Sequence, residues 1–312
     1  MPKVSIIVPV YGVEKYIERC ARSLFEQTLD DIEYLFIDDC TPDKSLEILK
    51  NVLEEYPHRK NEVVIHRMEK NSGIAAVRKW GMLNATGDYV IHCDSDDWVD
   101  KEMYNILVNK AKEGGYDAVC CGYYVTDGTN GISYASFKSN KKEEYITNCL
   151  YQKESASLCT KLFHRSLFDS DVIYPKDAMG EDITLSLQLL YRCKSICFVA
   201  KPLYFYYNNL QSITKVASKE HAIKRFYQVK NNIKIIDSFL SKSSNNSEAT
   251  QKALLCFKHK QRNLLTAYLR FSDVYDLWKN SFPISSIDVL QMPITTKEKI
   301  LYLFRYFKIR KK

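Results

Sequence analysis

The feature that most constrains the fold of this chain is the stretch from residue 71 to residue 100, NSGIAAVRKWGMLNATGDYVIHCDSDDWVD. After Gly73 the apolar residues recur at helical spacing, and the short apolar run Tyr89–Ile91 is typical of a buried strand. That strand leads into three carboxylates, those of Asp94, Asp96 and Asp97. Because ligands bind at the carboxyl ends of strands in open α/β sheets, this stretch predicts a wound α/β fold with its site at this point.

Three carboxylates this close together repel one another unless a cation lies among them. Hard divalent cations prefer oxygen ligands, and Mg²⁺ is commonly held by one or two carboxylates together with substrate phosphates. The cluster therefore predicts a site for Mn²⁺ or Mg²⁺ and a phosphorylated donor. The alternative is a solvated acidic turn that caps the helix starting at Lys101, which would account for one or two of the carboxylates.

The first part of the chain alternates between apolar strands and amphipathic helices. Strands are predicted at Val4–Val10, Tyr34–Ile37, Val63–Ile65, Tyr89–Ile91 and Ala118–Tyr124, and helices at Val13–Gln27, Ser45–Tyr56, after Gly73 and at Lys101–Glu113. This alternation indicates a parallel sheet with right-handed crossovers. Residues 126–142 are rich in Gly, Ser, Asn and Lys and predict a surface loop. Helices at Glu143–Tyr151 and Gly180–Tyr191 and a strand at Tyr204–Tyr207 are predicted to follow.

Beyond Lys219 the pattern is almost wholly helical, and the charge changes sign. Residues 201–312 carry 21 Lys and Arg against 7 Asp and Glu, a net charge of +14, whereas residues 1–200 carry 24 against 31, a net charge of −7. We therefore predict a catalytic domain over residues 1–215 and a helical region over residues 216–312 that faces an anionic partner. Nucleic acid is not expected as that partner, because the chain has no zinc pattern and no recognisable nucleic-acid motif.

Cysteine usage and the chain ends predict a cytoplasmic protein. The ten cysteines include no CxxC pair, and several lie in apolar patterns where free thiols pack as small hydrophobes. The N-terminal apolar run is short and lacks the cleavage site of a secretory signal. No run of about 18 apolar residues predicts a transmembrane helix.

Polar groups also follow the first two strands. Tyr11 can cover a nucleotide base, and Asp39 can accept a hydrogen bond from a base N–H. Arg78, on the helix before the acidic cluster, can reach phosphate oxygens. Since parallel strands end at one edge of a sheet, we expect these groups and Asp96 to surround one nucleotide diphosphate. Simple packing of Tyr11 and a solvated Arg78 are the alternatives.

Seven segments form an ordered set of motifs. They are KVSIIVPVYG at 3–12, FIDDCTPDKS at 36–45, NSGIAAVR at 71–78, GDYVIHCDSDD at 87–97, KLFHRSLF at 161–168, GED at 180–182 and PLYFYYNNLQSIT at 202–214. The set closely resembles that of the family 2 glycosyltransferases of the GT-A fold, and the resemblance covers about residues 1–215. It implies a Rossmann-like wound mixed sheet that binds a nucleotide sugar, with a mainly α-helical C-terminal extension. It also implies inverting sugar transfer of the bacterial polysaccharide-biosynthesis type.

The resemblance further implies roles for individual residues. Asp94-Ser95-Asp96 would be the DxD metal motif, with Asp96 and Asp94 as ligands, and Asp182 would be the catalytic base. The residues expected to bind the donor, a UDP-sugar, are Pro9, Val10, Tyr11, Glu14, Asp39, Asn71, Gly73, Arg78, Asp94 and Ser95. The residues expected to close the site over donor or acceptor are Glu181, Lys161, Tyr206, Gln211 and Ser212.

Inverting transfer requires such groups whatever the family. The acceptor hydroxyl must lose its proton as it attacks, so a carboxylate base must lie on the face opposite the leaving group. The departing nucleotide diphosphate gains charge that a cation can neutralise. Asp182 follows Gly180 at a predicted helix start, where an interaction with the helix dipole is the alternative explanation.

Three other classes remain open. A sugar-nucleotide pyrophosphorylase would need a Gly-rich basic loop after the first strand, where this chain has VYGVE at 10–14. A phosphatase with Asp38 as nucleophile would need an Asp-x-Asp spacing that DDC at 38–40 lacks. A non-catalytic nucleotide-sugar-binding protein would not need both Asp96 and Asp182.

The last segment, KEKILYLFRYFKIRKK at 297–312, carries seven Lys or Arg and one acid. Its apolar stripe consists of Ile300, Leu303, Phe304 and Phe307. A basic amphipathic helix of this kind binds an anionic membrane surface. We therefore expect a peripheral protein on the inner face of the cytoplasmic membrane, acting on a saccharide or lipid-linked oligosaccharide acceptor. The alternative is a helix docked on the protein's own core.

Overall fold

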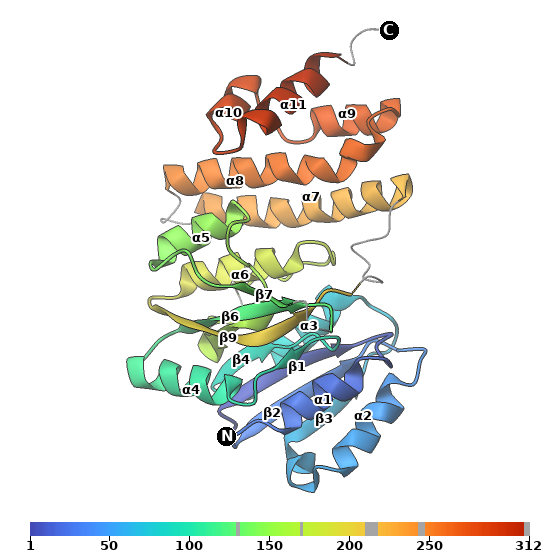
Figure 1. Ribbon diagram of the computed structural model, residues 1–312, viewed down its shortest axis with the longest axis vertical. Coiled ribbons are helices and arrows are strands. Elements are labelled where there is room, and N and C mark those ends of the chain that lie inside the picture. Colours follow the sequence, from blue (N-terminus) through green and yellow to red (C-terminus); the bar gives the residue numbers. More distant parts are fainter. Residues whose placement is uncertain (129–131, 169–170, 210–217, 243–246, 309–312) are drawn as a thin grey trace.

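The computed structural model shows a mixed β-sheet with helices on both faces and further helices stacked beyond one face (Figure 1). The structure describes residues 1–128, 132–168, 171–209, 218–242 and 247–308. The strands are β1 (Val4–Val10), β2 (Ile32–Asp38), β3 (Val63–Arg67), β4 (Tyr89–His92), β5 (Trp98–Val99), β6 (Ala118–Thr126), β7 (Ile132–Ala135), β8 (Lys161–His164) and β9 (Ile196–Tyr207).

The helices that cover the sheet come from the first two-thirds of the chain, and the stacked helices come from the last third. They are α1 (Ile17–Phe25), α2 (Ser45–Glu54), α3 (Ile74–Asn84), α4 (Met103–Gly114), α5 (Lys142–Leu150), α6 (Glu181–Arg192), α7 (Lys219–Lys242), α8 (Glu248–Gln261), α9 (Ser272–Asn280), α10 (Ser286–Gln291) and α11 (Thr296–Lys308). Short 3₁₀ segments are η1 (Pro57–Glu62), η2 (Leu158–Thr160), η3 (Arg165–Leu167) and η5 (Arg262–Tyr268).

The strand order is β3-β2-β1-β4-β8-β6-β9-β5, with β7 paired to β6. The first half is parallel, since β1 lies between β2 and β4 and β2 pairs with β3 in the same direction. β8 then runs antiparallel between β4 and β6. The predicted wound mixed sheet is confirmed. A wholly parallel sheet is wrong, because β8 is antiparallel to both β4 and β6 and β5 is antiparallel to β9.

Four strands differ from the sequence prediction, and two of them, β5 and β8, fall where no strand was predicted. The segment predicted as a loop over 126–142 contains β7, which pairs antiparallel with the end of β6. β9 is longer than the predicted Tyr204–Tyr207, because it runs beside β6 over most of its length with an irregularity near Gly122. Short strands with few alternating positions give a weak sequence signal, and pairing with a neighbour decides them.

The core is layered. One buried cluster lies between the sheet and α1, α2 and α4, and a second lies between the sheet and α3, α5 and α6. The second cluster continues without a break into α7 and α8 through side chains such as Ile233 and Phe257. The stacked helices therefore share a core with the sheet. The predicted boundary at residues 215 and 216 lies outside the described residues and stays a prediction.

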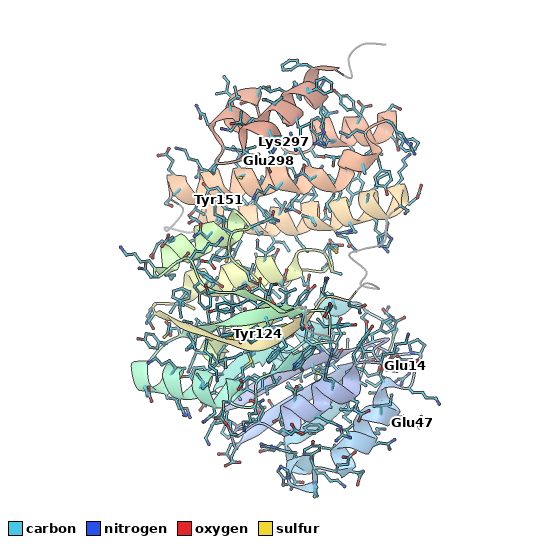
Figure 2. All side chains as sticks on the ribbon, viewed as in Figure 1. Glu14, Glu47, Tyr124, Tyr151, Lys297 and Glu298 are labelled. Carbon is cyan, nitrogen blue, oxygen red and sulfur yellow. The ribbon has the colours of Figure 1, made fainter. Side chains whose placement is uncertain are left out.

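The outermost layer consists of α9, α10 and α11, which enclose a third cluster around Trp278 and Tyr302. Figure 2 shows Lys297 and Glu298 in this layer and Glu14 toward the opposite end of the molecule. One face of α11 is thus docked on the protein's own core, as the alternative for the tail requires. Among the described residues, no helix combines the length and the apolar character needed to cross a bilayer.

Candidate functional site

The three acids after β4 lie in three different environments. Asp97 is 1% exposed, and its carboxylate accepts hydrogen bonds from the Tyr204 hydroxyl at 2.5 Å and the Tyr207 amide at 2.7 Å. Burial, followed by the charges of Asp94 and Asp96, raises the pKa of Asp97 well above its usual range. Asp97 therefore ties the acidic loop to β9.

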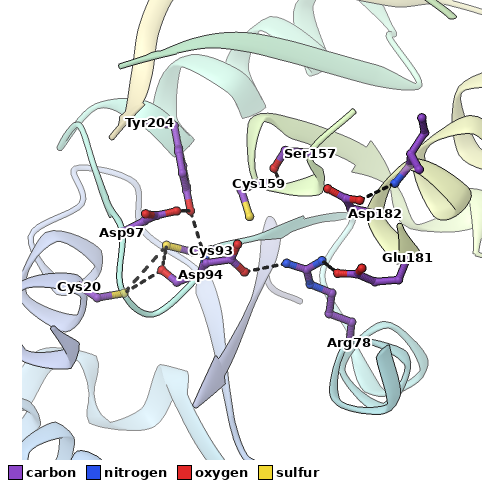
Figure 3. A network of polar contacts seen from close by, with 11 residues as sticks. Cys20, Arg78, Cys93, Asp94, Asp97, Ser157, Cys159, Glu181, Asp182 and Tyr204 are labelled. Carbon is purple, nitrogen blue, oxygen red and sulfur yellow. Dashed lines mark hydrogen bonds and ion pairs between the residues drawn. The ribbon is translucent and has the colours of Figure 1, made fainter. Parts of the chain in front are cut away.

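Asp94 is paired with a buried arginine. Its Oδ1 lies 2.7 Å from one terminal nitrogen of Arg78, and the other terminal nitrogen lies 2.5 Å from the Oε1 of Glu181 (Figure 3). Burial alone would lower the pKa of Arg78, but the two carboxylates raise it well above the usual value. The guanidinium thus supplies one positive charge to the acidic cluster, and it joins the end of β4 to the start of α6.

Asp96 is the acid that remains available to a cation. It is half-buried, and burial together with the Asp94 charge raises the pKa of its carboxyl. Its Oδ2 lies 3.4 Å from the side-chain amide of Asn209. The Oδ2 of Asp94 takes no part in the ion pair with Arg78. Among the described residues no group of three metal-ligating side chains occurs, so the metal site at Asp94 and Asp96 stays a prediction.

The backbone of the acidic loop is held by an arginine that the sequence analysis did not single out. Arg19 on α1 donates to the Asp96 carbonyl at 2.9 Å. Its guanidinium lies over the Trp98 ring at 3.7 Å and over the Tyr207 ring at 4.9 Å. These contacts fix the loop between α1 and β9. No local pattern indicates this role, because Arg19 reads as an ordinary polar position on an amphipathic helix.

The two acids at the start of α6 divide into a paired and an unpaired carboxylate. Glu181 is 7% exposed and bonded to Arg78; burial raises the pKa of its carboxyl, while the guanidinium opposes that rise. Asp182 is half-buried, and its Oδ1 accepts from the Ile183 amide at 2.8 Å. No ion pair to Asp182 is formed within the described part of the chain. The Arg78 bridge brings this carboxylate beside the acidic loop (Figure 3).

Asp39 has a structural partner that the sequence did not indicate. Its two oxygens accept from the amides of Ser72 at 2.6 Å and Gly73 at 2.8 Å, and the residue is 5% exposed. Gly73 has a φ of +82°, a value that favours glycine, and it starts α3. Asp39 thus holds the loop before α3. Each of its oxygens keeps a second lone pair, so the predicted contact with the base stays a prediction.

The loop after β1 exposes a tyrosine and is held by hydrogen bonds to the segment after β2. Tyr11 is 48% exposed, and the next amide, that of Gly12, donates to the Thr41 hydroxyl at 2.9 Å. The Glu14 amide donates to Asp43 at 2.9 Å. The remaining predicted donor residues differ in access: Pro9, Val10 and Ser95 are buried, and Asn71 and Glu14 are exposed.

The predicted closing residues are only partly brought to the site. Tyr206 is 43% exposed on β9, and the charges of Asp97, Asp96 and Asp94 act on it in addition to burial to raise its pKa. Lys161 is fully buried, and its ammonium donates to the carbonyls of Ser155 at 2.9 Å and Ser157 at 2.6 Å. A ligand contact for Lys161 would break these bonds, so its prediction as a closing residue is corrected to an anchor of this loop. Gln211 and Ser212 lie outside the described residues.

Comparison with known proteins gives consistent matches. The chain matches glycosyl transferase family 2 over residues 5–176. An uncharacterized glycosyltransferase, EpsJ of Bacillus subtilis (strain 168), is 33% identical over 257 residues, which cover 74% of this chain and 69% of that protein.

Solved structures share the fold. S. aureus TarS 1–349 in complex with UDP superposes with a TM-score of 0.64 at 20% identity, over 97% of this chain and 78% of that one. The mannosyltransferase PcManGT from Pyrobaculum calidifontis, in complex with GDP-Man and Mn²⁺, gives a TM-score of 0.57 at 13% identity. The match covers 99% of this chain and 81% of that one.

The family match spans more than half of the chain and contains the strand ends, the Arg78 helix and the acidic loop. The match excludes a pyrophosphorylase, a phosphatase and a non-catalytic binding protein. It confirms the sugar transferase that the sequence motifs imply. The chain belongs to glycosyl transferase family 2 and is a glycosyltransferase of the GT-A fold.

Proposed function

We propose that this glycosyltransferase, which takes its sugar from a nucleotide-sugar donor, uses a UDP-sugar and transfers with inversion to a saccharide or lipid-linked saccharide acceptor in surface polysaccharide biosynthesis. The observation that carries the proposal is the bridge from Asp94 through Arg78 to Glu181, because it sets the carboxylate of Asp182 beside the acidic loop. The UDP bound to TarS supports the choice of nucleotide.

Asp182 acts as the general base. It takes the proton of the acceptor hydroxyl while that oxygen bonds to the anomeric carbon. The bond from this carbon to the phosphate oxygen breaks, and its electron pair leaves with the nucleotide diphosphate. Asp182 suits this role because its carboxylate forms no ion pair with the described residues, whereas Glu181 is held in the ion pair with Arg78. A single displacement from the face opposite the leaving group inverts the centre.

The donor lies between Tyr11 and the acidic loop. Tyr11 stacks on the base, and Asp39 accepts from the base while it holds the Ser72–Gly73 loop. Asp96 and Asp94 would hold Mn²⁺ or Mg²⁺, which would offset the charge on the departing diphosphate. Both terminal nitrogens of Arg78 already pair with carboxylates, so we assign it a positioning role in place of the expected phosphate contact.

The acceptor class and location follow from the C-terminal region. Residues 201–312 carry a net charge of +14, and α11 exposes Phe307 and Ile300. Both features suit a protein that works at the inner face of the cytoplasmic membrane on a lipid-linked acceptor.

A donor screen tests the proposal. UDP-sugars and GDP-sugars are compared for thermal stabilisation of the protein with Mn²⁺ present, and the stabilising donor is then assayed for hydrolysis and transfer with and without EDTA. We expect a UDP-sugar to stabilise the protein, EDTA to stop turnover, and NMR of the product to show inversion. Retention at the anomeric carbon, EDTA-resistant turnover or a clear preference for GDP-sugars would contradict the corresponding part of the proposal.

A further inference from the structure

The outer end of the molecule exposes an unusual share of its apolar side chains. Within the described ranges, fourteen large hydrophobic residues are exposed, and six of them lie on the neighbouring helices α10 and α11. We call these six the apolar end: Ile287 (67% exposed), Leu290 (50%), Ile300 (61%), Leu301 (39%), Phe304 (53%) and Phe307 (61%). In Figure 1 both helices lie at the opposite end of the molecule from β1, β2 and β3. Single exposed hydrophobics are ordinary, but a group of this kind marks an interaction surface.

Two opposite faces of α11 are apolar, and only one of them docks on the protein. Tyr302 is 3% exposed, and its ring centroid lies 5.6 Å from that of Trp278 and 5.1 Å from that of His259. Tyr306 is one turn further along the same face, whereas Ile300 and Phe307 project from the opposite face. The second apolar face is therefore not needed to hold the helix in place.

α10 belongs to the same surface. The Leu290 carbonyl accepts from the Lys299 ammonium at 2.6 Å, which joins the end of α10 to the first turn of α11. Val289 faces inward and is fully buried, while Ile287 and Leu290 remain outside. The exposed face is thus a two-helix surface, broader than the stripe on the tail that the sequence predicts.

The charge around the apolar end selects the partner. Asp288 and Glu298 are the acids of residues 285–308, and each accepts from the amide that precedes its own helix, those of Ser285 and Thr295, at 2.7 Å. Residues 285–308 also contain Lys297, Lys299, Arg305 and Lys308, which gives this segment a net charge of +2, and residues 201–312 as a whole carry a net charge of +14. Two copies of such an end repel each other, whereas an anionic lipid surface attracts it.

We propose that the apolar end inserts into the interface of a bilayer that contains anionic lipids, with α10 and α11 lying together in the surface. The exposed side chains of the two helices enter the boundary between headgroups and acyl chains, and the surrounding Lys and Arg contact the phosphates. The inference rests on the proposed membrane-linked function for its biological setting, but vesicle binding measures it without any turnover.

The test is co-sedimentation of the full chain with vesicles of phosphatidylcholine alone or mixed with phosphatidylglycerol. We expect binding to the mixed vesicles that weakens with salt. The variant Ile300→Ser/Phe307→Ser should bind the mixed vesicles at least roughly tenfold more weakly, because it lacks two apolar side chains that the proposal places in the bilayer. The matched control is Leu83→Ser on α3, which is 59% exposed and distant from α10 and α11 in the fold. Thermal unfolding checks that each variant is folded.

Several outcomes overturn the inference. They are equal binding to both vesicle types, unchanged binding of the double variant, and wild-type protein that stays in the supernatant. A wild-type dimer in solution that becomes monomeric in the double variant, without vesicle binding, would assign the face to self-association. Transfer to a soluble acceptor separates this result from the proposed function, because both variants should retain that activity whether or not they bind lipid.

Discussion

Arg78 is the residue on which the geometry of the site depends. It is 5% exposed, and its two carboxylate partners come from segments that are far apart in the sequence. A buried ion pair contributes little net stability, but removing one partner leaves an uncompensated buried charge. The arginine is therefore a structural requirement for Asp94, a proposed metal ligand, and for Glu181, which precedes the proposed base.

Arg78→Met should lower the free energy of unfolding by about 3–5 kcal/mol, because Asp94 and Glu181 then lose their counter-charge. Urea unfolding measures the change. The double variant Arg78→Met/Glu181→Gln should recover part of the loss, since the neutral amide no longer needs the guanidinium. An Arg78→Met protein as stable as the wild type would show that the bridge does not matter for folding.

Asp182→Asn should reduce the rate of transfer by about 10²–10⁴ and leave donor affinity close to that of the wild type. The reason is that a general base acts in the transition state and contributes little to donor binding. Calorimetry of donor binding and steady-state kinetics separate the two effects. If donor affinity falls as far as the rate, Asp182 is a binding residue.

Asp96→Ala should abolish the Mn²⁺-dependent part of donor binding while the protein remains folded, because the half-buried Asp96 carboxylate is the acid left open to a cation. Calorimetric titration of UDP with and without Mn²⁺ measures this. Glu113→Ala, which removes an exposed acid at the end of α4, serves as the charge-matched control. Wild-type Mn²⁺ dependence in the Asp96 variant would move the metal site elsewhere.

Sequence reasoning named candidate site residues, whose roles stay predictions, but it did not identify all of their partners. The acids at the strand ends and the pair Glu181-Asp182 are local sequence patterns, so they can be recognised without the structure. Three features depend on segments that meet only in the folded structure. They are the ion pair of Arg78 with Glu181, the hydrogen bond of Arg19 to the acidic loop and the burial of Lys161. A sequence pattern names a charged residue without saying which charge it faces.

Among the elements, α8 carries a buried histidine with a predictable acid response. His259 is 8% exposed, and its ring packs against Tyr302. Burial, followed by the charge of Arg262, lowers the pKa of His259 from 6.5 to about 4. Between these values the unfolded chain binds a proton that the folded protein does not. Its contribution to stability is therefore complete above pH 6.5 and is lost as the pH falls toward 4.

His259→Phe should flatten the fall of stability with pH in this window, by an amount on the order of 3 kcal/mol at the acid end, because the ring packing stays and the titration is gone. Urea unfolding at a series of pH values provides the slopes. The exposed His58→Phe is the control and should leave the slope unchanged. Parallel slopes in wild type and His259→Phe would mean that His259 is not buried in its neutral form.

Element prediction succeeded where periodicity is long and local. The helix α3 and the strands β1 and β4 lie close to their predicted ranges because each has a full apolar pattern. β7 and β8 are four residues each, and their direction is decided by the neighbours β6 and β4. For α11 the docked face is that of Tyr302, with Leu303 partly buried beside it, while Ile300, Phe304 and Phe307 of the predicted stripe remain exposed, so membrane binding stays a prediction.

At the scale of the whole molecule, the split in charge corresponds to position. The acidic part of the sequence forms the sheet and its site, and the basic part forms the stacked helices (Figure 1). This division could be predicted from composition. The continuous core between them could not, because the contacts of α7 with α6 and of α8 with α5 join segments whose apolar faces give no indication of their partner.

The stacked helices also set the distance between the candidate site and α11. α7 packs on α6, whose first turn carries Asp182, and α11 shares its cluster with Phe226 of α7. The path from α6 to α11 runs through α7 and α8, which makes three helix-to-helix steps of about 8–10 Å each, so Asp182 stands roughly 25–30 Å from the helix that we place in the bilayer. A lipid-linked acceptor must then extend its accepting sugar across that gap. With synthetic acceptors in vesicles, transfer should rise sharply once the chain between lipid and accepting hydroxyl is long enough, while the same sugars free in solution should show no such threshold.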